Sequence, residues 1–152
     1  MDSDRLNSIA AGLGGRAVIE RRTAAIEVPA QTLGEACRMV SLIPGFYHLS
    51  TVTGVDDGDS IEVQYHFWKG TEFVSVIVHV PKTEPTLQSV CGEIPAAIMY
   101  EAEVHDMLGV NFRGNPLAGR KLLLPDNYPK DAPPPLRKEA NPEEIRKMMG
   151  LE

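Results

Sequence analysis

Two neighbouring stretches of alternating apolar and polar residues constrain the fold of this chain more than any other feature. Apolar side chains occupy every second position, at Ile61, Val63, Tyr65 and Phe67 and then at Val74, Val76, Val78 and Val80. A period of two is typical of β-strands with one buried face. A two-residue turn at Gly70-Thr71 brings Tyr65 opposite Val76 and puts all the apolar residues on one face. The two stretches therefore predict an antiparallel hairpin.

A further strand is expected ahead of this hairpin, joined to it by a turn at residues 57–59. We prefer a three-residue turn, which pairs Val55 with Ile61. A two-residue turn would put Gly54 and Val52 against the apolar face instead. The middle of the chain is therefore predicted to be an antiparallel meander of three strands.

The N-terminal part of the chain alternates between helical and strand patterns. Ser3 is expected to cap a first helix, and short strands are expected at residues 16–20 and 24–28. The segment Thr32-Leu33-Gly34-Glu35 has the pattern of a capping box. The helix that it begins has one apolar face and is expected to end at Pro44.

Regular periodicity is lost in the C-terminal third of the chain. A helix is expected after Pro85, broken or restarted at Pro95 and ended by Gly109. Seven of the 12 prolines then lie in residues 116–142. No strand or helix pattern survives there until Asn141-Pro142, which has the features of a helix start.

These patterns predict an α+β fold with a small antiparallel sheet, helices packed on one face and a long irregular C-terminal tail. We expect a core domain over residues 1–112 and an extended tail with a short terminal helix over residues 113–152. The apolar residues of the tail are too irregularly spaced to form a face of their own. Ordering about 25 residues costs a few tens of kcal/mol. The tail is therefore expected to be ordered only against a partner.

Composition and charge exclude several classes of function. The chain has 152 residues and a net charge of -6, which argues against nucleic acid as the main partner. No run of about 18 apolar residues is present, so no membrane span is expected. The N-terminus lacks the pattern of a signal peptide, so the protein is expected to stay where it is made. Cys37 and Cys91 belong to no paired motif, which argues against an iron–sulfur cluster or a zinc ribbon.

The densest group of titratable side chains lies in the third predicted helix. Glu101 and His105 are one helical turn apart and share a face, while Glu103 and Asp106 share another. A metal site could use Glu101 and His105, but the sequence does not locate a third ligand. One hypothesis is that these groups pair with charges on a neighbour or face solvent. The alternative is a free-standing metal-dependent enzyme that uses Glu101, His105 and Asp106.

Histidines also fall on the less apolar face of the predicted sheet. His66 and His79 lie there, and the hairpin register places Glu62 directly opposite His79. A cross-strand hydrogen bond is a commoner role for such a pair than catalysis, so we interpret these histidines as structural.

A longer motif overlaps the acidic helix and continues into the tail. It includes five spaced positions, namely Glu101, Glu103, Asp106, Gly109 and Phe112. It continues with four short segments, namely Gly114-Asn115-Pro116, Arg120-Lys121, Leu122-Leu123-Leu124-Pro125 and Pro135-Leu136-Arg137-Lys138-Glu139. This pattern resembles the signature of the thirty-kilodalton subunit family of respiratory Complex I, over roughly residues 30–140. Ala102 stands where that signature has an arginine, Asn115 stands where it has a histidine, and one extra residue follows Pro116.

The resemblance implies an α+β subunit that carries no redox centre, no metal and no other cofactor, and has no catalytic residue of its own. It implies a structural and assembly role in an ion-translocating oxidoreductase of the Complex I or membrane-bound hydrogenase type. Such a complex is expected at the cytoplasmic side of the cell membrane. The implied partners are the large subunit of the quinone-pocket or nickel–iron type, a small iron–sulfur subunit and a ferredoxin-like subunit. Iron–sulfur clusters of the electron-transport chain would lie in those other subunits.

The partner contacts are expected to come from the acidic helix and the tail. Carboxylates at an interface must be paired, and apolar anchors with flanking cations suit an extended segment wrapped over a larger subunit. The predicted interface residues are Glu101, Glu103, Asp106, Arg120, Lys121, Leu136, Arg137 and Lys138.

Overall fold

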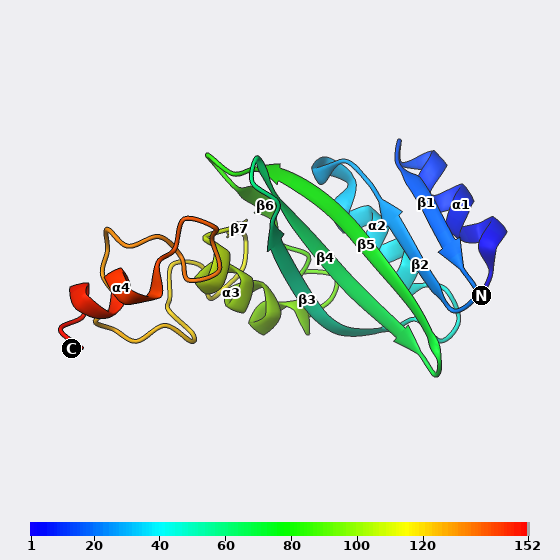
Figure 1. The fold of residues 1–152 in the computed structure, drawn as a ribbon. Coiled ribbons are helices and arrows are strands. Elements are labelled where there is room, and N and C mark those ends of the chain that lie inside the picture. The colour runs from blue at the N-terminus through cyan, green and yellow to red at the C-terminus, as the bar shows by residue number, and fades with distance from the viewer. Residues whose placement is uncertain (152) are drawn as a thin grey trace.

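The computed structural model describes residues 1–151 and confirms the α+β fold (Figure 1). Its centre is a five-stranded sheet with the order β1-β2-β5-β4-β3. The strands are β1 (Arg16–Glu20), β2 (Thr23–Glu27), β3 (His48–Asp56), β4 (Ser60–Lys69) and β5 (Glu72–Pro81).

The sheet is mixed, which corrects the prediction of an antiparallel sheet. β2 pairs in parallel with β5, whereas the pairs β1–β2, β3–β4 and β4–β5 are antiparallel. The parallel pair arises because a helical connection separates the first hairpin from the meander, and the last strand of the meander returns beside β2. The sequence patterns of the strands contain no information on this long-range pairing.

The β4–β5 hairpin has the predicted register. Tyr65 lies opposite Val76 and Val63 opposite Val78, with the turn at Gly70. All four of these side chains are fully buried. Alternation of apolar residues and a tight turn were therefore sufficient to fix this part of the core.

The register predicted between β3 and β4 is wrong by one residue over most of their length. Gly54 lies opposite Val63 and Val52 opposite Tyr65, which is the arrangement expected from the shorter turn. A shift in register near Ser50 ends this offset at the far end of the strand. The reason is packing, because a Cβ atom at residue 54 would lie 2.4 Å from Leu108 Cδ1. Only glycine lets the helix that contains Leu108, at residues 97–108, approach β3 so closely.

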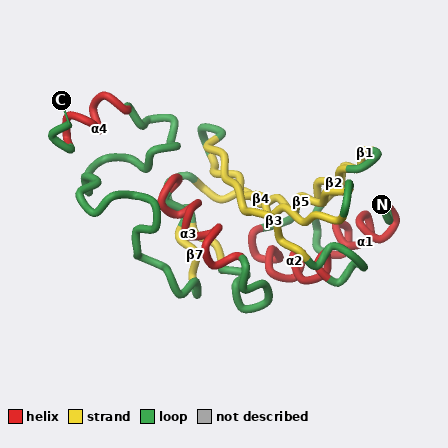
Figure 2. The backbone as a smooth tube through the Cα atoms, turned by 90° about the horizontal axis from the view of Figure 1, so that it is seen from below, coloured by secondary structure: helices red, strands yellow, loops and turns green. Residues whose placement is uncertain are grey.

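Two helices cover one face of the sheet, α1 (Ser3–Gly12) and α2 (Leu33–Ser41), the latter preceded by a short 3-10 turn, η1 (Ala30–Thr32) (Figure 2). The predicted apolar face of α2 is buried. The predicted caps are wrong: Asp2, not Ser3, caps α1, and Thr32 makes no capping bond to α2. The Thr32 hydroxyl donates to the Pro29 carbonyl instead.

The helix restarted at Pro95 is confirmed as α3 (Ala97–Leu108), which ends at Gly109 with a left-handed φ of 72°, whereas the residues between Pro85 and Pro95 form no helix. Residues 86–88 form a strand, β6 (Thr86–Gln88), which pairs in parallel with β7 (Asn111–Arg113). Burial of Leu87 and Phe112 stabilises this pair against the helical tendency of the sequence. α3 packs beside β3, at the edge of the large sheet (Figure 1).

Residues 114–141 contain no helix or strand. Much of this segment extends beyond α3, on the side away from the large sheet (Figure 1), but the Lys138 amide reaches Asp56 at the end of β3. The final helix, α4 (Pro142–Met148), begins as predicted, with the Asn141 side chain accepting a hydrogen bond from the Glu143 amide. Over residues 1–151, no helix has both the length and the apolar character that crossing a membrane requires.

Candidate functional site

Glu101 lies in α3 and is completely buried. Its Oε1 accepts hydrogen bonds from the Tyr65 hydroxyl and the Val90 amide, both at 2.9 Å. Its Oε2 accepts bonds from the Ser89 hydroxyl at 2.5 Å and the Asn115 amide group at 2.9 Å. These four donors join α3 to β4, to the loop after β6 and to the start of the tail.

The buried carboxylate changes the titration of its neighbours. Burial and the nearby Glu101 charge raise the pKa of Tyr65 well above its usual value. Burial is also the larger reason for the raised pKa of the Cys37 thiol, followed by the charge of Glu101. Both groups therefore stay protonated at neutral pH, and the Tyr65 hydroxyl serves as a donor.

Asp106 is buried at another face of α3 and holds the tail in place. Its Oδ2 accepts three backbone N–H groups in succession, from Leu122 at 2.7 Å, Leu123 at 2.6 Å and Leu124 at 3.1 Å. The backbone of the leucine run at residues 122–124 therefore curves around a carboxylate of this chain. Hydrogen bonds to a charged acceptor are stronger than neutral ones, so this contact is a firm attachment.

A second attachment joins the end of the tail to the sheet. The side chain of Asp56, at the end of β3, accepts bonds from the Lys138 amide at 2.9 Å and from Lys82 Nζ at 2.6 Å. Lys82 also pairs with Glu139 at 2.7 Å. Burial alone raises the pKa of Asp56, but the donors Lys82, Lys138 and Gly58 outweigh it and lower the pKa to about 2.

Arg137 is buried beside this ion-pair cluster. Its Nε donates to the Leu108 carbonyl at 2.6 Å, at the C-terminus of α3, and its Nη1 donates to the Lys82 carbonyl at 3.2 Å. A cation at this end of a helix is favoured by the helix dipole. The Leu136 amide donates to the Met107 carbonyl at 2.9 Å, so the segment runs along α3.

The eight predicted interface residues thus fall into two groups. Glu101, Asp106 and Arg137 are buried and their polar atoms are satisfied inside the chain, and their place at a partner interface stays a prediction. The rest are exposed; these are Glu103, Arg120, Lys121, Leu136 and Lys138. Lys121 is nevertheless occupied, since its ammonium group donates to the carbonyls of Pro125, Asp126 and Tyr128.

A surface groove of about 250 Å³ lies between β3 and α3. Its lining includes Gly54 and Val52 of β3, Glu103 and Met107 of α3, and Leu136 of the tail. It is mostly apolar, and Glu103 is the one charged residue among its lining residues. The groove therefore combines apolar surface with a single carboxylate.

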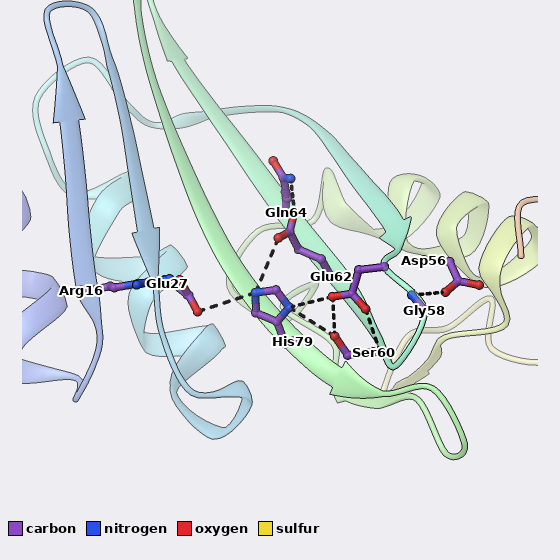
Figure 3. Close-up of polar contacts among 9 residues, drawn as sticks. Arg16, Glu27, Asp56, Gly58, Ser60, Glu62, Gln64 and His79 are labelled. Carbon is purple, nitrogen blue, oxygen red and sulfur yellow. Dashed lines mark hydrogen bonds and ion pairs between the residues drawn. The ribbon is translucent and has the colours of Figure 1, made fainter. Parts of the chain in front are cut away.

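The face of the sheet that α1 and α2 leave open carries a polar cluster around His79 (Figure 3). Glu62 lies across from it as predicted, with Oε2 3.5 Å from His79 Nε2, and Glu27 and Asp57 approach to 3.7 and 3.8 Å. Glu27 also pairs with Arg16 at 2.6 Å. The pKa of Asp57 is lowered mainly by hydrogen bonds from Ser60 and further by His79. This arrangement is a network of cross-strand contacts, in which the Ser60 hydroxyl donates to Asp57 Oδ2 at 2.7 Å and lies 3.5 Å from His79 Nδ1.

The metal hypothesis finds no support in the geometry of α3. Both oxygens of Glu101 and one oxygen of Asp106 are taken by internal donors, and His105 Nδ1 lies 2.9 Å from the Val110 carbonyl. Within residues 1–151, no group of three or more histidine, cysteine, aspartate or glutamate side chains is arranged to hold a metal ion. The three proposed ligands are therefore not brought together at one site.

Several residues that organise this region are not marked by the sequence. Its patterns do not single out Lys82, and they place Tyr65 only in the core. Asn115, notable in the sequence because it replaces a histidine of the motif, donates to Glu101 and to the Ile98 carbonyl. Asp56 ends a segment, residues 49–56, that also resembles a strand of the thirty-kilodalton subunit family, but this resemblance does not show which groups the carboxylate binds.

The fold and the site together define a class of α+β domain. Its last core helix carries a buried glutamate, and carboxylates of the core bind its C-terminal tail. Residues 26–146 match the family described as the 30-kDa subunit of respiratory-chain NADH dehydrogenase. The chain belongs to this family.

Individual relatives agree with this assignment. The C subunit of the NADH-quinone oxidoreductase of Moorella thermoacetica is 32% identical over 119 residues, which are 76% of this chain and 78% of the relative. The beta subunit of the membrane-bound hydrogenase of Pyrococcus furiosus is 33% identical over 109 residues, covering 68% of this chain and 62% of the relative. A chain from the membrane-bound sulfane sulfur reductase, an archaeal respiratory membrane complex, superposes with a TM-score of 0.80 at 25% identity. That match covers 95% of this chain and 89% of the other.

Proposed function

We propose that this chain is a non-catalytic, cofactor-free structural subunit of a membrane-associated, ion-translocating electron-transfer complex of the Complex I or membrane-hydrogenase type. The observation that carries the proposal is the match of residues 26–146 to a family of such subunits, together with relatives that are named as subunits of these complexes. The chain contributes to an oxidoreductase without performing its chemistry.

The internal bonding of the acidic helix supports a structural role. Glu101 is saturated by four donors and Asp106 accepts three, so neither carboxylate has the freedom that a general acid or base requires. The same bonds fix the tail against α3. The surface that remains for a partner is a rigid one formed by α3 and the tail together.

The partners we propose are the large subunit of the quinone-pocket or nickel–iron type, a small iron–sulfur subunit and a ferredoxin-like subunit. Iron–sulfur clusters would be carried by those subunits. The complex would sit at the cytoplasmic side of the cell membrane, with this chain as a peripheral component.

Affinity purification of the tagged chain from native membranes tests the assembly role. Mass spectrometry of the captured material is expected to identify the large and the iron–sulfur subunits in near-equal amounts. Recovery of the chain alone under conditions that preserve membrane complexes would contradict the proposal.

Elemental analysis and a visible spectrum of the purified chain test the absence of a cofactor. We expect less than about 0.1 equivalent of iron, nickel or zinc and no flavin absorption, because the only two cysteines are separate and one is buried in the core. One equivalent of a metal or of flavin would contradict the cofactor-free assignment. The proposed assembly role would be unaffected by that result.

A further inference from the structure

α3 carries a row of side chains that the rest of the described chain leaves uncovered. Met99, Glu103 and Met107 are spaced four residues apart and therefore lie on one face of the helix. Met99 is 52% exposed, Glu103 is exposed and Met107 is half-buried. Leu136 of the tail, 60% exposed, lines the same groove as Glu103 and Met107. We call these four residues the α3 stripe.

The α3 stripe is held rigidly although it faces solvent. Leu136 is fixed beside Met107 through its amide, which donates to the Met107 carbonyl. The next residue, Arg137, is buried and bonded to the C-terminus of α3. An exposed leucine on such an anchored segment loses little conformational freedom when it is covered, so it is suited to a contact.

We propose that the α3 stripe is the docking surface for a segment of a partner subunit that presents a lysine or arginine between apolar side chains. This inference rests on the proposed function and names the contact that performs it. The row spans about 12 Å from Met99 to Met107, or two turns of helix. Amphipathic segments commonly bind a partner through side chains spaced over such a length. Methionine side chains adapt to the shape of an apposed apolar group.

Charge decides the chemistry of the occupant. Glu103 has no hydrogen bond or ion pair among residues 1–151 and lies between the two methionines. Covering an unpaired carboxylate with apolar surface costs desolvation free energy. A cation opposite the carboxylate compensates that cost by forming an ion pair. The partner must therefore bring a basic group to this position, flanked by the apolar groups that meet Met99 and Leu136.

The charge of Glu103 excludes two other occupants. The sequence of α3, from Ala97 to Leu108, contains no lysine or arginine. Two copies of the chain that paired through this helix would place Glu103 against a second Glu103, which is repulsive. An anionic membrane surface would repel the carboxylate in the same way.

The test compares charge-reversed chains within the native complex. Cells carry a tagged chain as wild type, Glu103→Lys or Glu103→Gln, and the partner subunits that co-purify are quantified. We expect recovery to fall at least about tenfold for Glu103→Lys and less for Glu103→Gln, since only the first adds repulsion. Glu20→Lys is the matched control, because Glu20 is an exposed carboxylate on β1, the edge strand opposite β3 and α3 (Figure 1). The melting temperature of each isolated variant should equal that of the wild type.

Methionine oxidation gives a readout that does not depend on assembly yield. Dilute peroxide should oxidise Met99 readily in the isolated chain and at least about fivefold more slowly in the wild-type complex. Equal oxidation in both, or equal recovery of partners by wild type and Glu103→Lys, would overturn the docking surface. Light scattering of the isolated chains checks for a second copy. A wild-type dimer whose amount is changed by Glu103→Lys would overturn the proposed partner and identify a second copy of the chain as the occupant. Failure of the wild type itself to recover partners contradicts the proposed function instead.

Discussion

Three carboxylates of α3 have three different surroundings although they are separated by only a few residues. Glu101 is enclosed by neutral donors, Asp106 binds consecutive amides of the tail, and Glu103 faces solvent. The helical period explains the division, because each residue step turns the side-chain direction by roughly 100°. The burial of two of these acids thus depends on which segment packs against each side of the helix.

Removal of the Asp106 carboxylate is expected to destabilise the isolated chain. Asp106→Ala leaves the amides of Leu122, Leu123 and Leu124 without their acceptor, and we expect a loss of about 3 kcal/mol in the free energy of unfolding. Urea unfolding of the isolated chain measures this loss. Asp126→Ala, an exposed neighbour in the same tail, should change it by less than about 0.5 kcal/mol. Equal effects of the two substitutions would show that the amide contacts contribute little.

Asp56 should make the stability of the chain sensitive to acid. Its pKa in the folded chain is about 2, below its ordinary value near 3.8, so its contribution is complete above about pH 5. The contribution is lost as the pH falls from about 5 through about 2, because the unfolded state takes up a proton that the folded state does not yet bind.

Urea unfolding between pH 2 and 6 tests this acid dependence. Asp56→Asn should be less stable than the wild type at pH 6 and should lose less stability on acidification. Lys82→Met, which removes a donor to Asp56, should move the wild-type decline toward higher pH. Parallel curves for wild type and Asp56→Asn would refute the assignment.

At the scale of elements, the contact between β3 and α3 depends on a single glycine. Gly54→Ala would place a Cβ atom 2.4 Å from Leu108 Cδ1 and 3.3 Å from Val104 Cγ1. We expect a loss of about 1–3 kcal/mol, because both of these side chains are buried and have little room to move. Thermal and urea unfolding measure the loss.

Two further variants isolate this steric effect. Gly12→Ala in α1 adds a Cβ atom with no atom within 4 Å and should leave stability unchanged or raise it by up to about 1 kcal/mol. Combining Gly54→Ala with Leu108→Ala should cost less than the sum of the two single changes, since the methyl group then occupies vacated space. Strict additivity would place the strain elsewhere.

At the scale of the whole molecule, the tail begins with Asn115 bonded to Glu101 and is attached to the core at two further points along its length. The first attachment is at residues 122–124 on Asp106, and the second is at residues 136–139 on α3, Asp56 and Lys82. Tyr128 braces the segment between them by donating to the Pro133 carbonyl at 2.6 Å. These internal contacts order parts of the tail without a partner. The prediction that a partner orders the tail therefore applies to the residues between the attachments.

Hydrogen exchange can separate the two contributions to tail order. In the isolated chain we expect the amides of residues 122–124, Leu136 and Lys138 to exchange at least about tenfold more slowly than the amides of the exposed residues Asp126 and Lys130. In the assembled complex the protection should extend over the tail. Uniformly fast exchange of the tail in the isolated chain would mean that both attachments are open in solution.

Local patterns in the sequence were sufficient to predict those features of the fold that depend on residues close together in the chain. Alternation and the turn at Gly70 fixed the pairing of Tyr65 with Val76, and Asn141-Pro142 marked the start of α4. The apolar face of α2 followed from its helical spacing. Periodicity and capping operate over a few residues, so one sequence contains them in full.

The tertiary structure alone decided the features that depend on distant partners. The parallel pairing of β2 with β5, the strand at residues 86–88 and the register at Gly54 each result from packing against segments remote in sequence. The attachment of Lys138 to Asp56 spans 82 residues. A carboxylate in the sequence carries no mark of whether its hydrogen-bond donors come from its own chain or from a partner. Only the folded chain brings those donors within reach, because the burial that requires them is itself a product of the fold.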